Sequence, residues 1–387
     1  MPNKSSIVFV LPSFSHDGIK GFEKVVLQWI DALKANYSIH VVNIGGQKNL
    51  TTFDDKLGVT IHERAINKFS KVFYAFLALL RLRPLQSEYL TSKSTINYIA
   101  QLQRKYSVKA NIFVTIRTHC AGKNSEIPKN IMLAVDSMTL NFAGKYKKSR
   151  FFGRILFFAE YILLKLGEEN ILSEYNNIVF VSDRDAQNFN GVSPKVIPLS
   201  TEIPTIIEKK IENKVKILFT GNMSYEPNRT AVAWFYRQVY LKFKLEMHKV
   251  EFVVCGRFAE EWQFLTGLQE VKVKSDVLDI FEEILDCDIY IAPMQSGSGM
   301  QFKIIEAMAC AKPVITTRLG LGSIVCEGSG KDIIIADTPK EVFEAIKALS
   351  QNSKIRRDIG SAARVTVKNN YGKDIVGQKV RELLRAV

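Results

Sequence analysis

Short apolar runs alternate with amphipathic stretches along the whole chain. The apolar runs have the length of β-strands, and the stretches between them repeat apolar residues at helical spacing. Strands that are apolar on both faces are typical of parallel sheets covered by helices on both sides. The expected strands are residues 7–12, 37–44, 110–116, 130–136 and 177–182, and then 216–221, 250–256, 271–275, 288–293 and 313–317. This pattern predicts an α/β fold with two doubly wound, Rossmann-like domains.

A linker-like segment separates the two halves of the pattern. Residues 197–214 contain two prolines and a mixed run of charged side chains, and a length of 387 residues suits two domains. We expect an N-terminal domain over residues 1–203 and a C-terminal domain over 204–370. A last helix over 371–387 should return toward the N-terminal domain. The two sheets should face a central cleft, because ligands of such sheets bind at the carboxyl ends of the strands.

Composition favours a cytoplasmic protein. The five cysteines are scattered, none has metal-ligand or redox spacing, and we expect them to be small core residues in a reducing compartment. The apolar stretch at the start is too short for a signal peptide. No stretch approaches the 18 or so apolar residues of a membrane span.

Positive charge is concentrated in the N-terminal half. The chain carries a net +14, and residues 51–150 hold 17 basic and 6 acidic side chains. Residues 68–83 and 145–165 mix this charge with aromatic and aliphatic residues. Both could lie in the interface of an anionic membrane, or they could be core-facing helices with solvated cationic ends. No nucleic-acid-binding motif accompanies the basic charge, so nucleic acid is not an expected partner.

The segment 297–314, GSGMQFKIIEAMACAKPV, has the strongest functional signal. A glycine-bracketed loop follows an apolar strand and leads into an amphipathic helix that should start near Met300 and end before Pro313. Free amides and the helix dipole make such a helix start an anion site, and glycines allow close approach to the backbone. Lys303 and Glu306 are three residues apart and share a helix face. The first can offer charge to a diphosphate, and the second can accept hydrogen bonds from sugar or ribose hydroxyls.

This segment resembles the donor-nucleotide motif of GT-B glycosyltransferases, in particular glycosyltransferase family 4. Glu306 matches the second of the family's two glutamates, which stand eight positions apart. The first falls on Ser298, and Cys310–Ala311 replaces the usual small-residue–glycine pair. Lys303 fits a branch of sugar transferases in which a G-x-G loop is followed by K-x-x-E. The resemblance implies two Rossmann-like domains of the GT-B fold and transfer of a sugar from a nucleotide-diphosphate donor.

The same resemblance extends over residues 215–387 and implies further donor contacts. Residues 217–235 are similar to the opening strand and loop of the C-terminal domain in these enzymes, and Arg257 ends a later strand where a cation can meet phosphate. The segment around Val277 is similar to the one that borders the nucleotide base. The implied donor-binding residues are Gly221, Asn222, Arg257, Val277, Gly297, Ser298, Gly299, Met300, Gln301 and Glu306, with Lys303 in a catalytic role.

Two polar loops of the N-terminal half are candidates for the remaining chemistry. Gly21 lies in a glycine-containing loop that enters a helix, and this loop resembles the one that faces the donor phosphates. Asp136 ends an apolar strand and resembles the Asp-Ser turn of related transferases, where an acid can orient or deprotonate an acceptor hydroxyl. Asp136 could instead be a helix cap or a turn residue. His119, which follows another strand, is the second candidate for the catalytic role.

Two Asp-x-Asp strings invite a metal hypothesis, because metal-dependent GT-A enzymes use such a string. Asp183 and Asp185 fall at an expected helix start, with Ser182 or Asp183 as its cap. Asp286 and Asp288 lie where an expected helix passes into a strand, at the end of that strand away from the expected ligand site. We therefore expect no metal and no cofactor besides the donor substrate.

The resulting expectation is a retaining, metal-independent glycosyltransferase of bacterial surface-polysaccharide synthesis. Its acceptor would be a hydroxyl of a glycan or a lipid-linked molecule, and it would lie peripherally on the inner face of the cell membrane. One alternative is a catalytically silent GT-B scaffold that binds nucleotide sugar or glycan, suggested by Ser298. Another is a GT-B epimerase or phosphorylase, although no lysine motif for a pyridoxal cofactor is evident.

Overall fold

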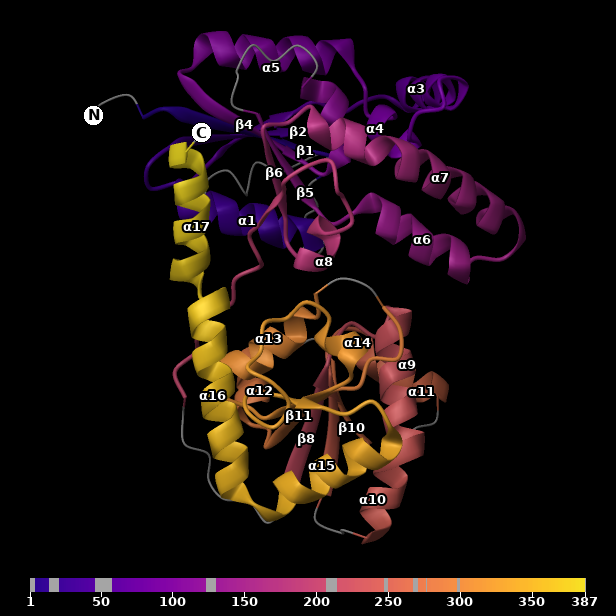
Figure 1. Cartoon of the computed structure of the whole chain (residues 1–387), viewed down its shortest axis with the longest axis vertical. Coiled ribbons are helices and arrows are strands. Elements are labelled where there is room, and N and C mark those ends of the chain that lie inside the picture. The colour runs from indigo at the N-terminus through magenta and orange to yellow at the C-terminus, as the bar shows by residue number, and fades with distance from the viewer. Residues whose placement is uncertain are drawn as a thin grey trace. The chain divides into compact units, whose positions relative to one another are not determined.

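The structure is a computed structural model that describes residues 4–13, 21–45, 58–122, 130–206, 214–246, 250–266, 271–275, 277–297 and 300–386. The chain divides into two compact units (Figure 1). Unit 1 comprises Met1–Leu199 and Val376–Val387, and unit 2 comprises Ser200–Ile375. The boundaries therefore fall at 199/200 and 375/376, where the sequence placed them at 203/204 and 370/371. Part of the expected linker, residues 207–213, lies outside the described residues.

Unit 1 contains a parallel sheet in the order β3-β2-β1-β4-β5-β6-β7 within its described residues. Its strands are β1 (Ser6–Leu11), β2 (Ser38–Asn43), β3 (Thr60–Glu63), β4 (Val108–Val114), β5 (Asn130–Val135), β6 (Asn177–Phe180) and β7 (Lys195–Val196). The strand order reverses between β1 and β4, which is the switch point of a doubly wound sheet. The short edge strands β3 and β7 were missed because each is short and not fully buried.

Helices cover both faces of this sheet (Figure 1). They are α1 (Gly21–Leu33), α3 (Lys68–Leu80), α4 (Leu85–Glu88), α5 (Lys93–Lys105), α6 (Met138–Lys148), α7 (Phe151–Ser173) and α8 (Asp183–Ala186), with a 3₁₀ helix η1 (Ile116–Gly122). The last helix, α17 (Lys373–Ala386), completes the core of this unit. Val376, Val380 and Leu384 of α17 are buried in one cluster with Trp29 of α1 and Phe9 of β1.

Unit 2 repeats the architecture with a parallel sheet in the order β10-β9-β8-β11-β12-β13 within its described residues. Its strands are β8 (Val215–Thr220), β9 (Val250–Cys255), β10 (Val271–Lys274), β11 (Ile289–Ala292), β12 (Val314–Thr316) and β13 (Ile334–Ile335). The order reverses between β8 and β11. The carboxyl ends of these two strands are therefore the place where a ligand of such a sheet is expected.

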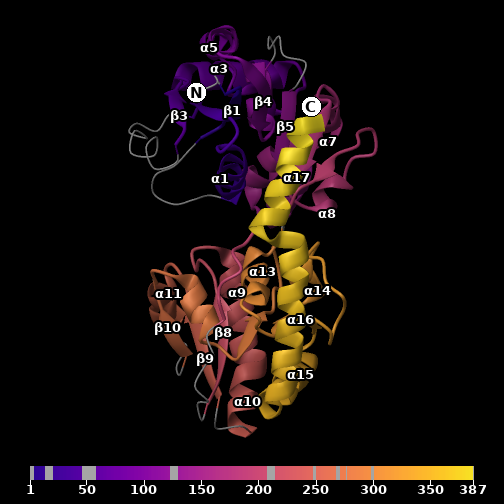
Figure 2. The same cartoon turned by 90° about the vertical axis from the view of Figure 1, so that its left-hand side faces the viewer.

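The helices of unit 2 flank this sheet in both views (Figures 1 and 2). They are α9 (Glu226–Phe235), α10 (Leu241–Glu246), α11 (Ala259–Thr266), α12 (Ile280–Leu285), α13 (Phe302–Ala309), α14 (Arg318–Leu321), α15 (Pro339–Gln351) and α16 (Ser353–Tyr371), with a π-helix η2 (Tyr236–Tyr240). Two parallel α/β sheets confirm the predicted fold class. Helix α13 also confirms the amphipathic helix predicted between Met300 and Pro313.

Candidate functional site

A lysine on α13 and an asparagine on α9 meet beyond the carboxyl ends of β8 and β11. Lys303 Nζ donates a hydrogen bond of 2.6 Å to Asn228 Oδ1, and it lies 4.2 Å from the ring centroid of Phe219. Asn228 Nδ2 in turn donates to the main-chain oxygen of Asn222. Pro227 stands in the first turn of α9, where its missing N–H costs nothing. The helix start therefore holds Asn228 against the loop after β8.

Glycine at position 221 makes room for this pair. A Cβ built on Gly221 would lie 2.6 Å from Asn228 Nδ2 and 3.2 Å from Lys303 Nζ. The neighbouring Gly256, at the end of β9, has φ +140°, and a Cβ there would lie 2.2 Å from the oxygen of Gly221. Side chains at these positions would displace the backbone or the polar pair. The two glycines thus bring strand ends and polar groups into close contact.

Burial pushes Lys303 toward its neutral form. Desolvation lowers the pKa of the Lys303 ammonium to about 7, although the nearby Glu306 carboxylate acts in the opposite direction. Lys303 and Glu306 lie on the same helix, as the sequence predicted. A lysine with this pKa is only partly charged at neutral pH, and an incoming anion would restore its charge.

The amino end of α13 faces the same region without a side-chain cap. Gln301 precedes the helix, and its side chain accepts no hydrogen bond from the first turn. Gly297 has φ +123°, and a Cβ there would have Pro227 as its nearest neighbour at 3.6 Å. Met300 is partly buried and packs against the unit-2 core. Ser298 and Gly299 lie outside the described residues, so their predicted donor contacts stay predictions.

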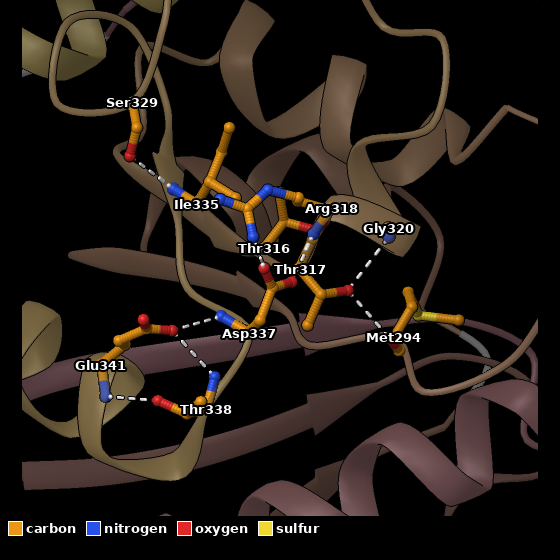
Figure 3. Close-up of polar contacts among 10 residues, drawn as sticks. All are labelled: Met294, Thr316, Thr317, Arg318, Gly320, Ser329, Ile335, Asp337, Thr338 and Glu341. Carbon is orange, nitrogen blue, oxygen red and sulfur yellow. Dashed lines mark hydrogen bonds and ion pairs between the residues drawn. The ribbon is translucent and has the colours of Figure 1, made fainter.

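The loop after β12 fixes the far side of the β11 loop (Figure 3). Thr317 Oγ1 donates to the main-chain oxygen of Met294 at 2.8 Å and accepts from the Gly320 amide at 3.0 Å. Arg318 pairs with Asp337, and Thr338 and Glu341 form a capping box at the start of α15. Met294 Sδ lies 4.0 Å from Lys303 Nζ. The hydrogen bond from Thr317 therefore holds the loop after β11 in place, and Met294 of this loop contacts Lys303.

Three other predicted donor residues occupy the loops around this pair. Asn222 Oδ1 accepts from the amide of Ser224, so its side chain stabilises its own turn. Arg257 is exposed and follows β9, with its main-chain oxygen accepting from Met223. Val277 is partly buried against the core between β10 and α12. Gly221, Asn222 and Arg257 follow adjacent strands, whereas Val277 lies in a separate loop.

Asp136 follows β5 in unit 1, at the carboxyl edge of that sheet. Its Oδ2 accepts a hydrogen bond of 2.8 Å from Asn141 Nδ2. Burial raises the pKa of the Asp136 carboxyl, while Asn141, Arg117 and Lys145 act in the opposite direction. Val135, just before it, has φ +70°, a rare conformation for a β-branched residue. A buried carboxyl whose pKa is raised binds its proton more readily than a free aspartate, which is a common property of groups that accept or donate a proton in a reaction.

The turn after Asp136 is held by two other carboxylates. Ser137, and not Asp136, is the cap of α6, because Ser137 Oγ accepts from the amide of Leu140. Glu168 accepts from the amides of Met138 and Thr139, and Asp185 accepts from the amide of Ser137. Capping is thus done by the neighbours of Asp136, and its own carboxylate bonds to Asn141.

The two remaining N-terminal candidates have different surroundings. Gly21 is the first residue of α1, and the loop before it, residues 14–20, lies outside the described residues. His119 is buried in η1, with its ring 3.3 Å from the hydroxyl of Tyr175 and 3.7 Å from a carboxylate oxygen of Glu174. These contacts favour a structural role for His119.

Comparison with known proteins identifies the C-terminal region. Residues 214–352 match the sequence model of the family described as "Glycosyl transferases group 1". Residues 214–352 are a group 1 glycosyltransferase domain. A Klebsiella pneumoniae protein described as an uncharacterized 44.6 kDa protein in the cps region is 23% identical over 318 residues, covering 77% of this chain and 78% of its own length.

Solved glycosyltransferase structures share the architecture of both units. A glycosyltransferase of Rickettsia africae has a TM-score of 0.70 at 16% identity, covering 99% of this chain and 98% of its own. The Anabaena protein HepE, in complex with UDP and glucose, has a TM-score of 0.67 at 13% identity, covering 98% and 99%. These likenesses confirm the predicted GT-B fold and, with the family match, the prediction of a glycosyltransferase.

Neither Asp-x-Asp string belongs to a metal-binding cluster of the described residues. Ser182 caps α8, and its hydroxyl donates to Asp185, as predicted for a helix start. Asp286 and Asp288 both contact Lys216 at the start of β8, the opposite end of the sheet from Lys303. Within the described residues, no group of three or more His, Cys, Asp or Glu side chains could hold a metal ion.

Several residues of the candidate site were not predicted from the sequence. Asn228 was not singled out within the segment 217–235, although its side-chain amide accepts a hydrogen bond from Lys303. Asn141 and Arg117 were not singled out, although both lie near Asp136. The Pro-Asn pair directly after a Gly-Asn strand end is the signal that could have indicated Asn228. Asn141 lies only five residues after Asp136, in the first turns of α6, so this contact is local in the sequence. For Arg117 the sequence carries no such signal, because it approaches Asp136 only through folding.

Proposed function

We propose that the protein transfers a sugar from a nucleotide-diphosphate sugar to a hydroxyl group of a glycan or a lipid-linked acceptor. The observation that carries this proposal is the Lys303–Asn228 pair at the switch point of unit 2, beside the uncapped start of α13. A partly neutral lysine and a row of helix amides suit a ligand that brings its own negative charge. The complex of HepE with UDP and glucose supports the same ligand class.

In this proposal, Lys303 and the first turn of α13 stabilise the charge that develops on the leaving β-phosphate. Preorganised donors at developing charge are the usual source of such catalysis. Glu306 accepts hydrogen bonds from the ribose or sugar hydroxyls. The remaining donor contacts come from Gly221, Asn222, Arg257, Val277 and residues 297–301. No cofactor is required beyond the donor, and the reaction is metal-independent, with retained anomeric configuration expected from the family resemblance.

Asp136 would serve the acceptor side of the reaction. Its raised pKa and its contact with Asn141 suit a base that orients and deprotonates a hydroxyl. The relative from a cps region supports a role in surface-polysaccharide synthesis. We place the enzyme in the cytoplasm, peripherally on the inner face of the membrane, where an anionic surface would be its partner and nucleic acid would not.

A screen of nucleotide sugars tests the proposal. Thermal shift of the full chain should find one donor, and incubation with that donor should release the nucleoside diphosphate. Proton coupling constants of the product then give its anomeric configuration. Binding without hydrolysis or transfer, across candidate glycan and lipid-linked acceptors, would favour the silent scaffold. No shift with any nucleotide sugar would overturn both.

A further inference from the structure

The amino-terminal half of α7 presents large apolar side chains to solvent. Phe151 and Phe152 begin the helix and are 87% and 89% exposed. The second half is more buried, because Leu164 and Leu172 are fully buried, although Leu166 is 70% exposed. The exposed apolar residues of the first half are Phe151, Phe152, Ile155, Leu156, Phe158 and Ile162. The alternative that residues 145–165 form a core-facing helix therefore does not explain the first half of α7.

Helix α3 shows the same property over its whole length. Ala78 is its only buried residue. The exposed apolar residues of α3 are Phe69, Val72, Phe73, Phe76, Leu79 and Leu80. A helix that packed on the core would bury such a stripe. Within the described part of the chain, the largest group of exposed apolar side chains thus lies on α3 and α7.

A buried carboxylate connects the two helices. Glu160, in the middle of α7, accepts 3.0 Å hydrogen bonds from the amides of Leu85 and Gln86, which begin α4 directly after α3. Gly167 of α7 lies against Pro84, which a Cβ at 167 would approach to 3.0 Å. Figure 1 shows α7 in a hairpin with α6, with α3 and α4 near its other end. The exposed stripes are therefore parts of one folded unit.

The charge around these stripes is mainly positive, because Glu160 is buried and the acidic Glu88 is paired with Arg83. Residues 64–87 and 137–159 contain no aspartate or glutamate. Their basic residues are Arg64, Lys68, Lys71, Arg81 and Arg83, and Lys145, Lys147, Lys148, Arg150 and Arg154. A second copy of the chain on this surface would place cations against cations. An anionic lipid surface offers the complementary charge together with an apolar interior.

We propose that α3 and the amino-terminal half of α7, together called the docking surface, bind an anionic membrane surface. The aromatic and aliphatic side chains enter the headgroup boundary, and the flanking Lys and Arg side chains contact lipid phosphates. The docking is peripheral, since none of the described helices is long and apolar enough to cross a bilayer. This proposal rests on the membrane location given under the proposed function, and it names the residues that make the contact. It does not depend on whether the protein binds a nucleotide sugar.

Vesicle co-sedimentation tests the docking surface. The full chain should bind phosphatidylglycerol-containing vesicles at low salt and much less at high salt, and it should bind pure phosphatidylcholine vesicles weakly. The double variant Phe151→Ser/Phe152→Ser should lower the partition coefficient about tenfold or more. The triple variant Lys147→Gln/Arg150→Gln/Arg154→Gln should lower it about a hundredfold at low salt, since each basic residue near the surface strengthens binding roughly fivefold.

Matched variants in unit 2 control for general effects of hydrophobicity and charge. Leu245→Ser/Leu278→Ser removes two residues that are also highly exposed, and Lys340→Gln/Lys354→Gln/Arg357→Gln removes three exposed cations. Both should leave vesicle binding nearly unchanged. If they weaken it as much as the docking-surface variants do, attraction is nonspecific and the proposal is overturned.

Insertion is tested separately by tryptophan emission. Phe152→Trp should shift to the blue and be quenched by brominated anionic lipids, whereas Leu245→Trp should not. Absence of binding at either salt, or an unshifted Phe152→Trp, would overturn the assignment. A wild-type dimer that Phe151→Ser/Phe152→Ser converts to monomer, with vesicle binding unchanged, would instead identify this face as a contact between copies. Donor binding, measured on the same preparations by thermal shift, shows independently whether the proposed function fails.

Discussion

Lys303 in unit 2 and Asp136 in unit 1 are ionisable groups of opposite sign that desolvation pushes toward neutrality. The pKa of the lysine is lowered and that of the aspartate is raised, and each side chain is held by an asparagine amide. The surroundings differ. Lys303 stands beside glycines and an uncapped helix, where an anion can approach. Asp136 stands in a turn organised by other carboxylates. In the function we propose, the region around Lys303 binds the charge of the donor and Asp136 accepts a proton from the acceptor.

The largest expected effect is on the rate of sugar transfer when Asp136 is replaced, and it distinguishes a role in proton transfer from a role in donor binding. Asp136→Asn should lower the transfer rate about 10²–10⁴-fold while leaving nucleotide affinity unchanged, since a general base acts only in the chemical step. In the wild type, transfer should fall as the pH drops through the raised pKa of Asp136. Steady-state kinetics and a nucleotide titration measure both quantities. Equal losses of rate and of donor affinity would place Asp136 in the donor site.

Stability offers a control for this variant. Because the folded-state pKa of Asp136 is raised, its ionisation destabilises the folded protein once the pH exceeds the value of an unfolded aspartate. Asn removes that cost and retains the shape of the side chain. The melting temperature of Asp136→Asn at neutral pH should therefore not fall. A marked fall would show that the carboxylate is needed for folding.

A smaller effect is expected from Gly221→Ala in unit 2. The added methyl would displace Asn228 and Lys303, and donor affinity should fall about ten- to a hundredfold, the usual value of one or two lost charge-assisted hydrogen bonds. Gly144→Ala in α6 is the matched control, because nothing lies within 4 Å of its added Cβ. Calorimetric titration with the donor compares them. Similar donor affinities in the two variants would show that Lys303 and Asn228 do not contribute to donor binding.

Proton uptake on donor binding tests whether Lys303 is the group that becomes charged when the diphosphate binds. With the pKa of Lys303 lowered to about 7, the free protein at pH 8 holds this lysine mostly neutral. A bound diphosphate should raise that pKa, so binding should take up close to one proton. Titrations in buffers of different ionisation enthalpy measure the uptake. It should vanish in Lys303→Gln, and uptake that persists there would assign it to another group.

The smallest expected effect is that of a chelator. Lysine and helix amides carry the charge compensation in this account, so EDTA should leave turnover unchanged. The assay compares initial rates with and without chelator, and then with added Mg²⁺ or Mn²⁺. Activity that is lost with chelator and restored by a divalent cation would contradict metal-independent transfer.

The sequence predicted the parts of the molecule that depend on local pattern. Alternating apolar runs indicated both sheets, and the contiguous segment that contains Lys303 and Glu306 indicated the α13 site. Contacts between distant segments were not predictable. Asn228 reaches Lys303 from 75 positions away, and Glu168 caps the turn after Asp136 from the next helix. The exposed stripe of α3 has the spacing of a buried helix, and only the fold shows that it is uncovered.

The central claim is that unit 2 binds the nucleotide-diphosphate donor through α13. Calorimetric titration of the full chain with the donor found by the screen, for wild type and Glu306→Ala, tests it most directly. The account predicts an intact fold and an affinity lowered about ten- to a hundredfold, the value of a charge-assisted hydrogen bond of about 1.5–3 kcal/mol. An unchanged affinity in Glu306→Ala would contradict the claim.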